Sequence, residues 1–240
     1  MEEIASRLKS LRMPGMAACW TSWMETRSAS DLSLQDAMAL LLQAEEDARR
    51  ENRNARLIKE AKFRYQASIE QMTCDAAHGL SKTDLMSLAT CNFIKQGVPI
   101  IITGSTGSGK SYLASAIGHQ ACLMGFKVRY FGMLKLFEEI ELARVSATLH
   151  RFFDRMSQTD LLIIDDFGLK KLDGQQMLDL MEIMEDRHGR KSTIITSQVP
   201  VSDWYDLLEA NTTAADAILD RIVHTATRFT LSCDNSRRKK

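Results

Sequence analysis

The sequence predicts an α/β fold, in which a five-stranded parallel sheet covered by helices follows a small α-helical N-terminal domain. Three observations lead to this prediction. From Val98 onward, short apolar runs alternate with segments of helix length, which is typical of a parallel sheet with helical crossovers. Before that point, apolar residues recur at helical spacing. A glycine-rich octet also stands between the first apolar run and the next helix-like segment.

Length and composition limit the class of protein. The chain has 240 residues, 45% of them apolar and 26% charged, and no apolar run approaches the ~18 residues of a membrane span. Its N-terminus lacks a secretory signal, so we expect a soluble, cytoplasmic protein without membrane partners. The five cysteines and five histidines show neither paired nor metal-ligand spacing, which argues against a disulfide scaffold or a zinc site.

The N-terminal region reads as three helices. Apolar positions at Ile4, Leu8 and Leu11 predict the first, and Pro14-Gly15 separates it from the second. The third begins after a cap at Asp31 or Ser33 and continues through Lys62. We expect a domain boundary near residue 67, which gives a small α-helical domain at 1–67 and an α/β domain at 68–240.

Five apolar segments of strand length follow. The predicted strands are Ile100–Thr103, Val128–Phe131, Leu161–Asp165, Thr193–Ser197 and Arg228–Ser232. About 28 residues separate the second strand from the third, where one crossover helix would suffice. The pattern there predicts two helices, Leu134–Arg144 and Ala147–Met156, so that one of them is an insertion.

The octet at residues 104–111 completes the phosphate-loop pattern G-x-x-x-x-G-K-[ST] between a strand and a helix. Its glycines allow backbone N–H groups to turn inward around phosphates. Lys110 would lie at the β- and γ-phosphates, and the Ser111 hydroxyl would ligate Mg²⁺. The expected nucleotide-binding residues are Gly104, Ser105, Thr106, Gly107, Ser108, Gly109, Lys110, Ser111 and Tyr112.

Two carboxylates end the third predicted strand, as in a Walker B motif. Asp165 and Asp166 follow four apolar residues, so they should emerge at the carboxyl edge of the sheet, where such sheets bind ligands. Asp165 would hold Mg²⁺, and Asp166 would orient or deprotonate the attacking water. Alone, the same residues could equally be an acidic turn.

Two further candidates for catalysis lie downstream. Gln198 or Ser197, at the end of the fourth strand, would face the γ-phosphate if that strand lies between the first and third. Arg221, on a later amphipathic helix, could reach a neighbouring subunit's nucleotide as an arginine finger. The alternative for Arg221 is a surface ion pair with Asp220.

Basic residues are concentrated in two places although the net charge is zero. Residues 49–64 contain seven basic and two acidic side chains, and the chain ends Arg-Arg-Lys-Lys. An assembly that repeats these segments could present a basic track to DNA phosphates, with sequence-tolerant, salt-dependent binding. A solvated helix face is the alternative. The candidate DNA contacts are Arg49, Arg50, Arg53, Arg56, Lys59 and Arg237.

Together these blocks resemble the IstB-like ATPases, the transposition helpers of bacterial insertion sequences, and behind them the AAA+ helicase loaders and replication initiators. The resemblance covers most of the chain, including the loop at 104–113, the segment 161–168 and the segment 192–204. It continues through 217–224 to Arg237. The phosphate loop is common to very many ATPases, whereas the later blocks in this order are more selective.

The resemblance implies an ATPase that uses ATP and Mg²⁺ to assemble head to tail, as a spiral or ring, on double-stranded DNA. Residues 1–67 would be the DNA- or partner-binding domain and residues 68–240 the AAA+ ATPase domain. The assembly would assist the element's transposase. The resemblance assigns Gln198 as the first sensor and Arg221 as the arginine finger. The extra helix predicted between the second and third strands also resembles the helical insertion that is typical of the AAA+ replication initiators. A replicative helicase loader is the main alternative, and a nucleotide-gated switch that hardly hydrolyses ATP is another.

This chain departs from that pattern at two points. Asp166 stands where many AAA+ ATPases have glutamate, so we expect slow hydrolysis that DNA or a partner stimulates. Only eight residues follow Ser232, which leaves no room for a C-terminal lid domain. Arg237 could therefore be a second sensor or a DNA contact.

Overall fold

The computed structural model describes residues 2–26, 32–72, 79–208 and 210–232. The chain divides into two compact units, Met1–Arg56 and Leu57–Lys240. The division falls within α3 (Leu34–Ala61), upstream of the boundary predicted near residue 67.

Unit 1 contains α1 (Glu2–Ser10), α2 (Pro14–Thr26) and most of α3, the three helices that the sequence predicts. Ser33 caps α3, because its Oγ accepts a hydrogen bond of 3.2 Å from the backbone N–H of Asp36. The other candidate cap, Asp31, lies outside the described residues.

A buried carboxylate joins α2 to α3. Glu45, on α3, accepts hydrogen bonds from the backbone N–H groups of Gly15 (2.8 Å) and Met16 (3.2 Å), in the first turn of α2. Gly15 permits this approach, since an added Cβ would lie 2.4 Å from the carbonyl oxygen of Ala44. Burial by itself would raise the pKa of Glu45, but the hydrogen bonds from Arg49, Met16 and Gly15 and the charge of Arg49 lower it overall.

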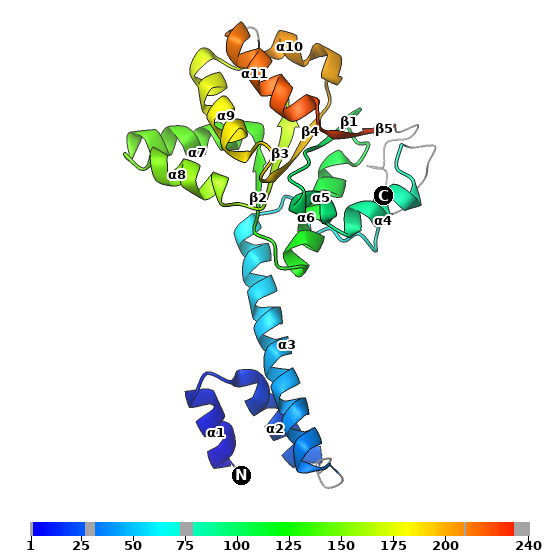
Figure 1. The fold of residues 1–240 in the computed structure, drawn as a ribbon, viewed down its shortest axis with the longest axis vertical. Coiled ribbons are helices and arrows are strands. Elements are labelled where there is room, and N and C mark those ends of the chain that lie inside the picture. Colours follow the sequence, from blue (N-terminus) through cyan, green and yellow to red (C-terminus); the bar gives the residue numbers. More distant parts are fainter. Residues whose placement is uncertain (1, 27–31, 73–78, 209, 233–240) are drawn as a thin grey trace. The chain divides into compact units, whose positions relative to one another are not determined.

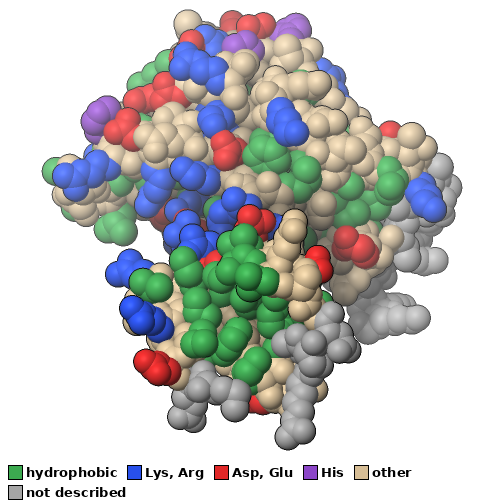
Figure 2. All heavy atoms as spheres, turned by 60° about the horizontal axis from the view of Figure 1, so that its bottom comes forward, with side chains coloured by type: hydrophobic (Ala, Val, Ile, Leu, Met, Phe, Trp, Pro, Cys, Tyr) green, Lys and Arg blue, Asp and Glu red, His purple; other side chains and the backbone are tan. Residues whose placement is uncertain are grey.

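Unit 1 also leaves apolar side chains on its surface. Figure 2 shows hydrophobic side chains gathered over these helices, with lysine and arginine side chains beside them. The large apolar residues exposed there are Ile4, Leu11, Leu34, Met38, Leu40 and Leu42.

Unit 2 has a five-stranded, all-parallel sheet in the order β2-β3-β4-β1-β5, which confirms the five predicted strands (Figure 1). β4 lies between β3 and β1, as the interpretation of Gln198 requires. The strands are β1 (Ile100–Gly104), β2 (Val128–Gly132), β3 (Leu161–Phe167), β4 (Ser192–Ser197) and β5 (Thr227–Leu231).

Helices cover both faces of this sheet. Alternate residues of β3 point to opposite faces, so Leu161 and Ile163 join one apolar core while Leu162 and Ile164 join the other. The first core includes α6 (Lys110–Leu123), α4 (Lys82–Ala89), α5 (Asn92–Lys95) and the end of α3. The second includes α7 (Met133–Val145), α8 (Leu149–Ser157), α9 (Gly174–Arg187), α10 (Trp204–Leu207) and α11 (Thr212–Val223), and a 3₁₀ turn at Val201–Asp203 packs beside it.

The two predicted helices between β2 and β3 are present as α7 and α8. The prediction that the second begins at Ala147 was wrong by two residues, because Ala147 has a positive φ of 53° and belongs to the turn between the helices. Across the described part of the chain, no helix combines the length and apolarity that a bilayer crossing requires.

Candidate functional site

The phosphate loop connects β1 to α6, and its backbone depends on glycine. Gly107 and Gly109 have φ values of 86° and 93°, in the left-handed region that side chains disfavour. At Gly104, an added Cβ would lie 2.2 Å from the carbonyl oxygen of Leu231. The loop therefore directs backbone N–H groups and the N-terminus of α6 toward one place, which suits an anion.

The side chain of Lys110 folds back onto the phosphate loop. Its Nζ donates to the carbonyl oxygens of Gly104 (2.7 Å) and Ser105 (2.9 Å), and the residue is buried. Burial lowers its pKa, and the charges of Asp165 and Asp166 oppose that shift. Among the described residues, the buried Oγ of Ser108 has no hydrogen-bond partner.

The acidic end of β3 contains a β-bulge. Ile164 pairs with Ile195 and Phe167 with Ser197, so β3 advances three residues while β4 advances two. Asp166 has a left-handed φ of 61° in this bulge, and its N–H donates to Thr196 Oγ1 over 3.2 Å. The bulge lets both Asp165 and Asp166 direct their carboxylates to the same edge of the sheet.

Asp165 is fully buried and receives hydroxyl hydrogen bonds on both carboxylate oxygens. Ser111 Oγ donates to Oδ1 over 2.8 Å, and the Thr196 hydroxyl donates to the same oxygen. The Tyr130 hydroxyl donates to Oδ2. Burial, followed by the hydrogen bond to Asp165 and its charge, raises the pKa of Tyr130. Asp165 and Ser111 are thus close enough for both to ligate one metal ion.

Arg64 is a site residue that the sequence reasoning missed. Its Nη1 lies 2.9 Å from Asp166 Oδ2 and 3.4 Å from Asp165 Oδ2. Arg64 lies in a basic run about 100 residues before these carboxylates in the sequence. No local sequence pattern therefore predicts the contact. Tyr130 and Thr196 were missed for the same reason, since each is an ordinary strand residue in sequence.

Gln198 contacts the phosphate loop directly. Thr106 Oγ1 donates to Gln198 Oε1 over 2.6 Å. The hydroxyl of Ser197, the alternative candidate, instead donates to the carbonyl oxygen of Phe167 over 2.7 Å. A cavity of about 470 Å³ brings together Thr106, Gly107, Gly109, Lys110, Ser111, Tyr112, Asp166 and Gln198, with Arg64, Tyr65 and Leu169 completing its lining.

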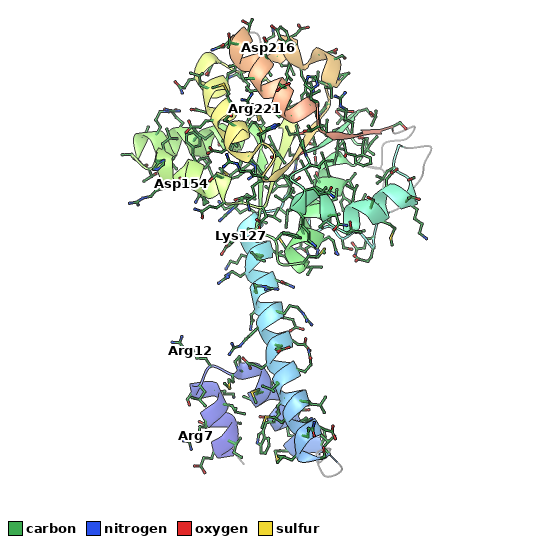
Figure 3. All side chains as sticks on the ribbon, in the orientation of Figure 1. Arg7, Arg12, Lys127, Asp154, Asp216 and Arg221 are labelled. Atoms are coloured by element: carbon green, nitrogen blue, oxygen red, sulfur yellow. The ribbon has the colours of Figure 1, made fainter. Side chains whose placement is uncertain are left out.

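Arg221 does not line this cavity. It lies on α11, where it forms an ion pair with Glu185 of α9 and donates to the carbonyl oxygen of Ala217 over 2.9 Å (Figure 3). The alternative pairing with Asp220 was wrong, because successive residues of a helix do not face each other. Asp220 lies instead 3.6 Å from His224 Nε2.

The candidate DNA contacts of α3 are exposed, and acidic side chains lie beside Arg49 and Arg50. Arg49 pairs with Glu45 at 2.7 Å and Arg50 with Asp47 at 2.5 Å. Arg53, Arg56 and Lys59 are exposed further along the same helix. Arg237 lies outside the described residues.

The residues at this edge fit a magnesium-bound nucleoside triphosphate. The glycine-shaped loop, the unpartnered Ser108 hydroxyl and the buried Lys110 ammonium suit phosphate oxygens. The hydroxyl of Ser111 and the carboxylate of Asp165 supply the hard oxygen donors that Mg²⁺ prefers.

Comparison with known proteins agrees with a nucleotide-binding site at this edge of the sheet. Residues 6–240 match the family model described as IstB-like ATP binding protein. An insertion sequence ATP-binding protein of Sinorhizobium fredii is 38% identical over 234 residues, which cover 98% of this chain and 95% of that protein.

Solved structures share the fold at low sequence identity. DnaI superposes with a TM-score of 0.60 at 20% identity, covering 72% of this chain and 91% of its own. The DnaC helicase loader gives 0.56 at 19% identity, covering 70% and 97%. The core of unit 2 is therefore of the same α/β type as these two proteins.

Proposed function

The chain belongs to the IstB-like ATP-binding family, and from this premise we propose that it is a Mg²⁺-dependent ATPase that assembles on duplex DNA and assists the transposase of its insertion sequence. The observation that carries the proposal is the convergence of Lys110, Ser111, Asp166 and Gln198 on one cavity, with Asp165 bonded to Ser111. The name of the Sinorhizobium fredii relative, which ties that protein to an insertion sequence and to ATP, supports the same role.

Each side chain of the site has a task in this proposal. Lys110 would leave the loop carbonyls and neutralise the β- and γ-phosphates, and Ser111 and Asp165 would hold Mg²⁺. When bound, the metal supplies charge neutralisation on the phosphate oxygens. Asp166 orients the attacking water, and Gln198, held by Thr106, contacts the terminal phosphate. We expect slow hydrolysis in the isolated chain, because Asp166 stands where many AAA+ ATPases have the longer glutamate side chain.

Assembly on DNA is the central test. Sedimentation velocity and electron microscopy would compare the protein with a long DNA duplex in Mg·ATP, in Mg·ADP and without nucleotide. We expect large assemblies only with Mg·ATP and DNA, and none for Lys110→Ala. Assemblies that form equally without nucleotide would overturn the proposal.

The DNA-binding surface has a separate test. Removing Arg53, Arg56 and Lys59 together should weaken binding and reduce the dependence of affinity on salt, because three phosphate contacts are lost. Fluorescence anisotropy across a salt series measures both quantities. The control, which removes the same charge from exposed positions elsewhere, combines alanine at Lys82, Lys95 and Arg190. Equal effects of the two triple variants would place the DNA contact elsewhere.

The proposed arginine finger is tested by mixing subunits. Arg221→Ala should keep nucleotide binding and lose turnover, because the finger acts on a neighbour's nucleotide. Mixing it with Lys110→Ala subunits should restore part of the turnover, since each variant supplies what the other lacks. Absence of any rescue would assign Arg221 to the ion pair with Glu185 alone.

A further inference from the structure

Arg64 places a positive charge against the two carboxylates at the acidic end of β3. Its guanidinium is the donor to Asp166 and approaches Asp165, the two carboxylates proposed to act at Mg²⁺ and water. It lines the nucleotide cavity, and also a second cavity of about 500 Å³ that extends along Tyr130 and Met133. The ion pair of Arg64 with Asp166 is thus part of both linings.

The backbone before Arg64 is anchored by packing, so this contact follows from the fold. Phe63 lies against Gly118 of α6, where an added Cβ would come within 2.5 Å of the Phe63 ring. The same ring packs edge-on against Tyr130, with 6.3 Å between ring centroids. Tyr130 in turn donates to Asp165. Phe63 therefore holds Arg64 within reach of the carboxylates.

A guanidinium and a magnesium ion would compete to neutralise the same two carboxylates, although Arg64 lies at Oδ2 of Asp165 and Ser111 at Oδ1. The other nearby cation, Lys110, is bonded to loop carbonyls, so Arg64 is the side chain that neutralises Asp165 and Asp166 by direct contact. We propose that Arg64 is the internal counter-cation of Asp165 and Asp166 in the nucleotide-free protein, and that Mg²⁺ displaces it when Mg·ATP binds. This inference rests on the proposed function of the site as a Mg·ATP site.

The displacement has a consequence for α3. Arg64 lies three residues beyond the end of this helix at Ala61, and Ala61 and Leu57 are buried in the apolar core that also holds α6. Losing the carboxylate contact frees the side chain at the point where the chain leaves α3. Metal–nucleotide binding therefore changes the contacts of the segment that follows the basic helix, before any hydrolysis occurs.

The test measures how much Mg²⁺ is needed for nucleotide binding. A fluorescent mant-ATP at fixed concentration would be titrated with Mg²⁺ in the presence of wild type, Arg64→Ala and Arg64→Gln. Without the competing guanidinium, the half-saturating Mg²⁺ concentration should fall about fivefold in both variants, the size expected for loss of a partly exposed ion pair. The glutamine variant keeps a polar side chain of similar reach, so the result does not depend on the alanine variant folding.

Lys62→Ala is the matched control. It removes one positive charge two residues away, and Lys62 pairs with Glu139 at 3.5 Å rather than with either site carboxylate. Its half-saturating Mg²⁺ concentration should stay within about twofold of wild type. An Arg64 variant that shifts no more than Lys62→Ala, or that needs more Mg²⁺, would overturn the inference. Failure of wild type itself to bind mant-ATP with Mg²⁺ would instead overturn the proposed function.

Discussion

Glu45 in unit 1 and Asp165 in unit 2 are both carboxylates buried against hydrogen-bond donors, and their donors differ in kind. Glu45 in unit 1 is 6% exposed and is held by two backbone N–H groups and the side chain of Arg49. Asp165 in unit 2 is 0% exposed, and it accepts hydrogen bonds from four side chains: three hydroxyls and a guanidinium. Both satisfy the rule that a buried charge needs hydrogen bonds.

The kind of donor separates a structural carboxylate from one that exchanges ligands. Backbone N–H groups at the start of α2 cannot turn away from Glu45 unless the helix end is rebuilt. Hydroxyl groups can rotate and a guanidinium can swing away, so Asp165 can accept a metal without a change in the backbone. Glu45 is therefore expected to affect stability alone, and Asp165 chiefly metal binding and turnover.

The largest effect is expected for Asp165→Asn. Loss of the charge should lower ATP turnover about 10²–10³-fold, because the metal is no longer held against the phosphates. Nucleotide binding without Mg²⁺ should change little, since the phosphate loop is untouched. Phosphate-release kinetics and mant-ATP titrations measure the two quantities.

Asp160→Asn is the control on the same chain segment. Asp160 directly precedes β3 and pairs with Lys191 at 2.5 Å, away from the nucleotide cavity. Its turnover should remain close to wild type. If Asp165→Asn retained comparable turnover, Asp165 would be structural, like Glu45, and the contrast between the two carboxylates would disappear.

Removing Glu45 should produce the largest loss of stability in unit 1. Glu45→Ala leaves two backbone N–H groups of α2 without their acceptor, which costs about 2–3 kcal/mol. Denaturant unfolding measures the loss, and ATP affinity should not change. Glu46→Ala, which alters the exposed neighbouring glutamate, is the matched control. Equal losses of stability in the two variants would mean that the hydrogen bonds from Gly15 and Met16 to Glu45 contribute nothing.

What the sequence could predict follows the same division between local and distant contacts. The five strands, the phosphate loop and the acidic strand end were predictable because each is a contiguous pattern whose geometry comes from its own residues. Three of the donors to Asp165 were not, because Arg64, Tyr130 and Thr196 are brought to it only by the order of strands and the packing of Phe63. The hydrogen bond from Gly15 to Glu45 joins residues 30 positions apart, so the sequence could not predict it either.

A smaller effect is expected for Thr196→Val, which removes one hydroxyl donor. Thr196 both donates to Asp165 and accepts from the N–H of Asp166, so valine leaves both without this partner. The loss of stability should be about 1–2 kcal/mol, because the other donors to Asp165 remain. Thermal unfolding measures it, with Thr103→Val as the control at a partly exposed position on β1. A loss of turnover as large as that of Asp165→Asn would show that Thr196 does more than hold the two aspartates.

The smallest predicted effect is the loss, at acidic pH, of the contribution of Glu45 to stability. The pKa of Glu45 in the folded protein lies below its ordinary value of 4.5. Its charged form is therefore favoured by folding, so its contribution to stability is complete above pH 4.5 and is lost as the pH falls through the folded pKa. The stability difference between wild type and Glu45→Gln should be constant from neutral pH to about pH 5 and shrink below 4.5. Fluorescence of Trp20 and Trp23 on α2, in a Trp204→Phe background, reports unfolding of unit 1. A difference that grows on acidification would reverse the sign of the pKa shift and remove Glu45 as the charged cap of α2.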